Sequence, residues 1–210
     1  SFGLTKDESE PKGRAAFADD LKGLLDHLGV ERTAIVAHSM GGRAGVGFTL
    51  RNPGRVWGLV LSGSNGGSVN DEARLVRDGH QNRKPDRPPG ALRALSLGFA
   101  ASKPEMAFLY RQFMRLNPKH DPDFLTVPLG YQGSTHERLT ESGVPILYIV
   151  GEEDALIAPK TIEIAASLVP QSRLITMPEA GHSVYYEQPD VFNDHVHRFL
   201  TEVMPLATDG

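Results

Sequence analysis

The stretch from Thr33 to Gly42 reads TAIVAHSMGG. Its first half is apolar and partly β-branched, which is typical of a buried strand. The residues that follow, Arg43 to Leu50, are compatible with a helix that stops at Arg51-Asn52-Pro53. Ser39 is therefore predicted to lie at a sharp turn between a strand and a helix.

Such a turn suits a nucleophilic serine. It points the side-chain oxygen outward, and it needs small residues two positions before and after the serine so that strand and helix can pass closely. Ala37 and Gly41 meet this need, although the usual pattern G-x-S-x-G has glycine at the first position. The alternative, that Ser39 only caps the following helix, stays open here.

The composition is that of an ordinary globular chain. Its 210 residues are 40% hydrophobic and 23% charged, which is enough for one sizeable core, so we expect one domain with an insertion. A net charge of -4, dispersed basic residues and the lack of a long apolar run argue against nucleic-acid and membrane partners. The first residues do not resemble a signal peptide, so we expect a cytoplasmic location.

Cysteine and metal chemistry are not indicated. The chain has no cysteine, which excludes disulfides, a thiol nucleophile and cysteine zinc sites. No His-x-x-x-His pair with acidic support lies near a predicted strand end. We therefore predict no metal and no cofactor.

Helices and strands alternate along most of the chain. A strand, a helix and a second strand in succession favour parallel pairing, so we predict an α/β fold with a mostly parallel sheet flanked by helices. Besides the strand before Ser39, the predicted strands are Val56–Ser62, Ile146–Val150 and Ser172–Met177, and the predicted helices are Phe17–Leu28, Lys160–Leu168 and Pro189–Val203.

The middle of the chain departs from this alternation. We assign residues 1–67 and 141–210 to the α/β core and residues 68–140 to a helical lid insertion, in which Ala91–Ala101 and Pro104–Leu116 are helix candidates. Phe108, Phe113 and Met114 are candidates for a substrate pocket, although core packing is the usual role of such residues. The insertion also carries a basic cluster, made of Arg74, Arg77, His80, Arg83, Lys84 and Arg87.

Two further functional groups follow predicted strands. Asp154 comes after the strand that ends at Val150, and His182 comes after the strand that ends at Met177. Open parallel sheets place functional groups at the carboxyl ends of their strands. A serine hydroxyl needs an imidazole to accept its proton, and the imidazole needs a carboxylate to orient it, so Ser39, His182 and Asp154 form a candidate triad. Glu152 and Glu153 compete with Asp154 for the acid position.

The three segments Ala37–Gly42, Val150–Asp154 and Ala180–His182 resemble the catalytic segments of the α/β-hydrolase family, in the family's order of nucleophile, acid and histidine. The resemblance runs from about residue 14 to residue 204 and is strongest to small bacterial esterases, enol-lactonases and haloperoxidase-like proteins. It implies that Ser39 is the nucleophile, that His182 is the general base and then acid, and that Asp154 orients His182. It also implies that the backbone N–H of Met40 is an oxyanion donor.

The sequence departs from the family at its amino end. Family members ordinarily have several strands before the segment that starts here near residue 14, including one whose loop supplies a second oxyanion donor, and none is found before Phe17. We therefore expect an amino-terminally shortened core, an exposed sheet edge covered by a homo-oligomer or another association, and turnover lowered by a factor on the order of 10² to 10³.

Three functions remain open at this stage. The first is a serine-dependent carboxylic ester hydrolase that acts through an acyl-enzyme on small or medium acyl esters. The second is a lactone or C–C bond hydrolase of a ring-cleavage product, with the basic cluster holding a carboxylate, although a solvated helix face is the alternative reading of that cluster. The third is a catalytically silent remnant that binds a ligand or a partner chain.

Overall fold

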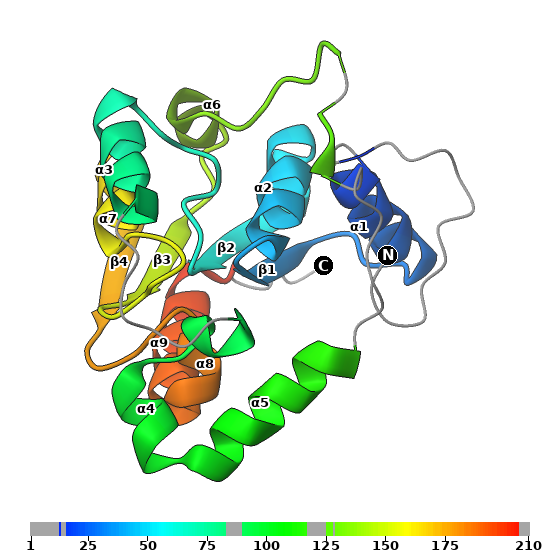
Figure 1. The fold of residues 1–210 in the computed structure, drawn as a ribbon. Coiled ribbons are helices and arrows are strands. Elements are labelled where there is room, and N and C mark those ends of the chain that lie inside the picture. The colour runs from blue at the N-terminus through cyan, green and yellow to red at the C-terminus, as the bar shows by residue number, and fades with distance from the viewer. Residues whose placement is uncertain (1–12, 14–15, 83–89, 117–124, 128, 206–210) are drawn as a thin grey trace.

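Four parallel strands form a single sheet in the order β1-β2-β3-β4. The structure, a computed structural model, describes residue 13 and residues 16–82, 90–116, 125–127 and 129–205 (Figure 1). The strands are β1 (Thr33–His38), β2 (Val56–Ser62), β3 (Ile146–Gly151) and β4 (Ser172–Met177). This confirms the predicted α/β fold with its parallel sheet. The amino-terminal residues 1–12 lie outside the described part.

The two central strands are almost completely buried, as expected for parallel strands that are covered on both faces. In the register, Ser62 pairs with His38 on one side and with Ile149 on the other, and Ile149 pairs with Ile175. The carboxyl ends of all four strands therefore meet at one edge of the sheet, and the loops that follow them are neighbours.

Helices cover both faces of the sheet (Figure 1). One core cluster, around Phe48, Leu61 and Tyr148, joins the sheet to the helices on its first face. A second cluster, around Ile149 and Phe192, joins the sheet to the two helices that follow β4. The helices of the core are α1 (Ala16–His27), α2 (Gly41–Arg51), η2 (Pro53–Arg55), α3 (Asp71–Asn82), α6 (His136–Glu141), α7 (Pro159–Ser167), α8 (Val184–Glu187) and α9 (Pro189–Val203). Among the described helices none is long and apolar enough to cross a bilayer.

The segment predicted as a lid divides into parts with different packing partners. Helix α3 packs against α7, and α6 lies beside α2 with Leu139 buried in the core. The remaining helices have a small cluster of their own around Leu95, Phe99 and Ala107, and the longest of them, α5 (Pro104–Leu116), extends away from the sheet in Figure 1. These helices, called the cap from here on, are η3 (Gly90–Ala94), α4 (Leu97–Ser102) and α5 (Pro104–Leu116).

The predicted helix Ala91–Ala101 is wrong as a single helix, because the structure divides it into η3 and α4. Ser96 separates them: it has extended backbone, and its hydroxyl accepts a hydrogen bond from the N–H of Phe99 at 3.1 Å. A serine that caps a helix in this way starts a new helix rather than continuing an old one. The other predicted helices and strands that lie in the described part are confirmed to within a few residues.

Candidate active site

Ser39 lies at the turn between β1 and α2, with a backbone φ of +52°. This left-handed conformation is uncommon for a residue with a side chain and costs on the order of 1–3 kcal/mol. The turn is held by a hydrogen bond from the N–H of Ser39 to the carbonyl of Ser62 at 2.8 Å and by one from Gly42 N–H to the carbonyl of Ser39 at 3.0 Å. The strained turn predicted from the sequence is therefore present.

Of the two small residues predicted for this turn, Ala37 lies at the close approach of α2, 3.4 Å from a Cβ position on Gly45, whereas Gly41 does not. A Cβ atom on Gly41 would meet nothing within 4 Å. On Gly42, however, a Cβ would lie 2.4 Å from the hydroxyl of Ser64, and on Gly45 it would lie 3.1 Å from Ile35. The close approach of α2 to the sheet is thus made at Gly42 and Gly45.

Asp154 and His182 form a buried hydrogen-bonded pair. Nδ1 of His182 lies 2.7 Å from Oδ2 of Asp154, and the two residues are only 3% and 2% exposed. The other carboxylate oxygen accepts hydrogen bonds from the N–H groups of Leu156 at 2.8 Å and Ile157 at 2.9 Å, which fix its orientation. In the neutral ring, a proton on Nδ1 that is donated to this carboxylate leaves Nε2 as the nitrogen that can accept a proton.

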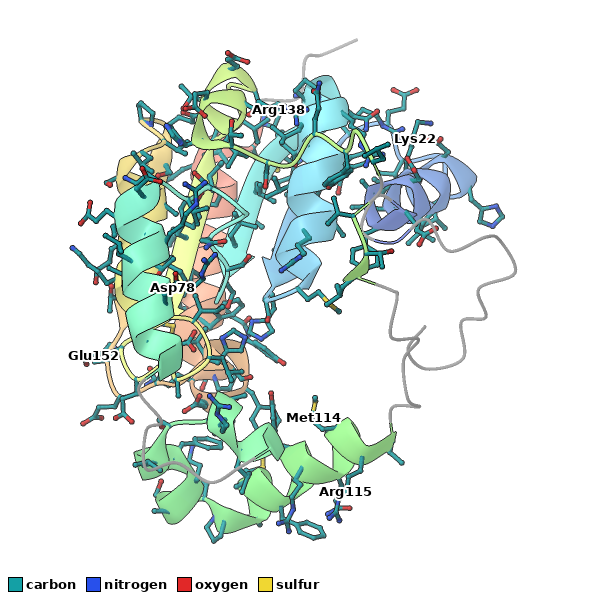
Figure 2. The ribbon with its side chains drawn as sticks, turned by 45° about the horizontal axis from the view of Figure 1, so that its top comes forward. Lys22, Asp78, Met114, Arg115, Arg138 and Glu152 are labelled. Carbon is teal, nitrogen blue, oxygen red and sulfur yellow. The ribbon has the colours of Figure 1, made fainter. Side chains whose placement is uncertain are left out.

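The three acidic candidates after β3 differ in their contacts. Asp154 is the residue on His182, whereas Glu152 is exposed and points outward in Figure 2. Glu153 has its backbone N–H bound to the carbonyl of Ala180 at 2.8 Å, so the turn itself is anchored to the loop that carries His182. The turn thereby presents Asp154, and not its neighbours, to the imidazole.

Two glycines at strand ends leave space for the histidine loop, and the sequence analysis did not single them out. Gly63 follows β2 with a φ of +57°, and a Cβ there would lie 2.9 Å from Cε1 of His182. At Gly151, the last residue of β3, a Cβ would lie 2.0 Å from the carbonyl oxygen of Gly181. A glycine directly after a buried strand, next to a candidate catalytic loop, is the signal that could have identified them.

His38 brings the serine turn and the histidine loop together. Its ring centroid lies 4.7 Å from that of His182 and 4.8 Å from that of Tyr185. Burial, and then the nearby charge of His182, lower the pKa of His38 from 6.5 to about 4. His38 is therefore neutral at neutral pH, and the residue directly before Ser39 packs on the imidazole that Asp154 holds.

A cavity of about 720 Å³ opens beside the serine turn. Ser39 and Met40 line it, and Met40 is the N-cap of α2, where the first N–H groups of a helix have no partner inside the helix. No acidic residue is among the described residues that line this cavity. Its basic residues are Arg43, Arg51, Arg77 and Arg138.

These four arginines all interact with other residues of the chain. Arg51 pairs with Asp19 at 2.6 Å and Arg77 with Asp78 at 2.9 Å, both at the exposed surface. Arg138 donates from Nη1 to the backbone carbonyls of Gln132 and Gly133. Carbonyl oxygens do not neutralise its charge, so this end of the cavity is positively charged.

The three apolar residues predicted to contact substrate lie on α5 of the cap. Phe108, Phe113 and Met114 are about half exposed and are not among the residues that line this cavity. Figure 2 shows Met114 pointing from α5 toward the body of the molecule, whereas the neighbouring Arg115 points away from it.

Among the described residues, no three histidine or carboxylate side chains are placed to hold a metal ion.

The chain is similar to known hydrolases in sequence and in structure. The model of the "Alpha/beta hydrolase family" matches residues 1–195. A 2-hydroxy-6-oxononadienedioate/2-hydroxy-6-oxononatrienedioate hydrolase of Pseudomonas putida is 29% identical over 204 residues, which cover 87% of this chain and 68% of that protein. The sn-1-specific diacylglycerol lipase of Mus musculus is 28% identical over 212 residues, with 88% and 64% covered. The structure of a thermophilic esterase from Thermogutta terrifontis is similar with a TM-score of 0.76 and 26% identity, covering 97% of this chain and 78% of that one.

Proposed function

This chain belongs to the alpha/beta hydrolase family, and from that premise we propose that it is a serine-dependent carboxylic ester hydrolase that acts through an acyl-enzyme on small or medium acyl esters. The observation that carries the proposal is the buried hydrogen bond between His182 and Asp154, together with the packing of His182 on His38, the residue that precedes a serine in a left-handed turn. Similarity to a thermophilic esterase and to a diacylglycerol lipase supports the choice of esters.

In the proposed reaction Ser39 attacks the ester carbonyl while its hydroxyl proton passes to Nε2 of His182. The backbone N–H of Met40 donates to the oxygen that becomes negative in the tetrahedral intermediate. His182 then gives the proton to the departing alcohol, which leaves an acyl group on Ser39, and a water molecule repeats the sequence to release the acid. Asp154 stays ionised throughout and stabilises the imidazolium.

A fluorophosphonate probe tests this proposal directly, because it reacts only with an activated serine. We expect labelling of the wild-type chain and none of Ser39→Ala. Asp154→Asn should lower kcat for a p-nitrophenyl ester by about 10⁴-fold, because an amide favours the wrong tautomer of His182. Glu152→Gln is the matched control and should leave kcat unchanged, since Glu152 does not touch His182.

A negative result with the probe would contradict the enzyme proposal. If the wild-type chain and Ser39→Ala both resist the probe and bind small molecules equally well, the enzyme proposal is lost. The third hypothesis, a catalytically silent member of the family that binds a ligand or a partner chain, would then take its place.

A second candidate function is lactone or C–C bond hydrolysis of a ring-cleavage product that carries a carboxylate. The positively charged wall of the cavity favours it, as does similarity to a hydrolase named for dioate substrates. A pair of esters that differ only in a terminal carboxylate tests it. We expect Arg43→Gln to lower kcat/KM about tenfold for the acidic ester alone, and Arg115→Gln, whose side chain points away from the body, to affect neither ester. Equal kcat/KM values for both esters in the wild-type chain would argue against an anionic substrate.

A further inference from the structure

The cap is attached to the segment that carries His182. This segment, residues 180–187, is called the histidine segment and consists of the loop after β4 and helix α8. Three hydrogen bonds join it to η3 and α5: from Ser183 N–H to the carbonyl of Ala94 at 2.9 Å, between the hydroxyls of Tyr110 and Ser183 at 2.8 Å, and from the Tyr186 hydroxyl to the carbonyl of Met106 at 2.9 Å.

The carboxylate of Glu187 makes a fourth connection, and this one reaches the peptide next to the imidazole. Glu187 is 4% exposed. Its Oε1 accepts a hydrogen bond from the N–H of Gly181 at 2.9 Å, and its Oε2 accepts one from the N–H of Ser96 at 2.9 Å. Gly181 directly precedes His182, and Ser96 is the residue that starts α4. One side chain thus holds the backbone of the histidine segment and the backbone of the cap together.

There is no free space between these two backbones. A Cβ atom on Gly181 would lie 2.6 Å from the carbonyl carbon of Leu95 and 2.6 Å from the nitrogen of Ser96. The peptide before His182 therefore touches the peptide that starts α4. Any displacement of the start of α4 must move the peptide at His182 as well, because packed backbones cannot absorb it.

Burying the carboxylate of Glu187 costs free energy, which its hydrogen bonds offset only in part. Burial, together with the negative charge of Glu153, raises the pKa of Glu187 above its ordinary value, whereas the hydrogen bonds from Ser96 and Gly181 act in the opposite direction. An apolar side chain would fill the same space without this desolvation penalty. Only a carboxylate can accept from two separate N–H groups with its two oxygens.

We propose that Glu187 is a positioning residue that couples the cap to the imidazole of His182. The inference rests on the proposed function, since it takes His182 to be the general base. Glu187 keeps the imidazole in register with Ser39 only while both N–H groups are bound. A substrate that displaces or orders the cap therefore also displaces or orders His182.

Glu187→Gln tests the coupling, because the amide has the same shape but can accept from only one of the two N–H groups. We expect kcat and the rate of fluorophosphonate labelling to fall together by about tenfold, as for a base displaced by a fraction of an ångström, with KM changed less than about twofold. The low-field proton NMR signal of the His182 Nδ1–H should broaden, which a general loss of stability does not cause. Tyr186→Phe is the matched control: it removes the hydrogen bond to Met106, and both kcat and the signal should stay as in the wild type.

Two results would overturn the coupling. One is a folded Glu187→Gln chain with wild-type kcat, labelling rate and NMR signal, and the other is an equal loss in Tyr186→Phe, which would indicate mere loosening of the cap. Failure of the proposed function looks different, because then the wild-type chain itself is not labelled. If Glu187→Gln does not fold, amide exchange of the wild-type chain decides. The N–H groups of Gly181 and Ser96 bind the two oxygens of one carboxylate and should be equally protected, and a difference of more than about tenfold contradicts the coupling.

Discussion

His38 shows how one side chain can link the stability of the molecule to the geometry of its site. It is neutral in the folded chain because burial lowers its pKa to about 4, whereas in the unfolded chain its pKa returns to about 6.5. Between these values the unfolded state binds more protons than the folded state. The free energy of unfolding therefore falls as the pH falls through this range.

Replacing His38 by phenylalanine should remove this pH dependence while keeping a ring against His182 and Tyr185. From neutral pH to about pH 4, we expect the free energy of unfolding of the wild-type chain to drop by about 3 kcal/mol more than that of His38→Phe. Urea unfolding at both pH values measures the difference. Equal slopes for the two chains would show that His38 titrates normally in the folded state.

Gly63 offers a test of the packing around the imidazole. In Gly63→Ala the new methyl group would lie within 3.0 Å of Nδ1 of His182 and would push the ring away from Asp154. We expect kcat to fall about a hundredfold, a size typical of a misplaced catalytic group. Gly79→Ala in α3 is the control, because nothing lies within 4 Å of its Cβ position; it should stabilise the chain by about 1 kcal/mol and keep kcat. A fully active Gly63→Ala chain would mean that the ring has room to move.

Individual site residues could be predicted from the sequence only where a neighbouring strand or helix reveals their position. Ser39 sits between a recognisable strand and helix, and Asp154 and His182 each follow a strand, so parallel topology alone places all three at one edge of the sheet. Glu187 shows no such signal, because its partner Ser96 is 91 residues away and the hydrogen bond depends on how the cap packs. The role of Gly63 likewise depends on its contact with the ring of His182, which is distant in the sequence.

At the level of elements, one side of the cap helix α5 faces the body of the molecule and the other side faces away from it. Met114 points toward the body of the molecule and Arg115 points away (Figure 2). For an ester with a long acyl chain we expect Met114→Ala to raise KM about tenfold, because roughly two buried methylene equivalents are lost. Arg115→Ala should leave KM unchanged. If the two variants behave alike in steady-state kinetics, α5 does not contact the acyl group.

The helices of residues 68–140 could be found from the sequence, but their partners could not. Periodicity located α5 to the residue, yet it does not tell whether an amphipathic helix packs on the sheet, on another helix or on a cap. Helices α3 and α6 have partners in the core, and the cap has a core of its own. These contacts between distant segments set the packing of this region.

For the whole molecule, the outer edge of β1 is the surface that most invites association. Within the described part β1 pairs with β2 alone, and Val36 on this strand is 50% exposed. An unpaired edge with apolar residues readily pairs with another chain. We therefore expect light scattering to give the mass of two or more chains, and Val36→Lys to raise the dissociation constant at least about tenfold. Val191→Lys, at a similarly exposed position on α9, should have no effect. A single-chain mass at all concentrations would refute the association.

The common direction of the four strands has a practical consequence for handling the protein. Ser39, Asp154 and His182 all lie beyond the carboxyl ends of their strands, while the connections at Arg32 and Gly143 enter from the opposite end. A strand of six residues separates these ends by about 20 Å. A peptide tag or a surface linker attached at exposed Gly143 would therefore leave the reactive end facing solvent, so that an immobilised or fused form keeps full access to its substrates.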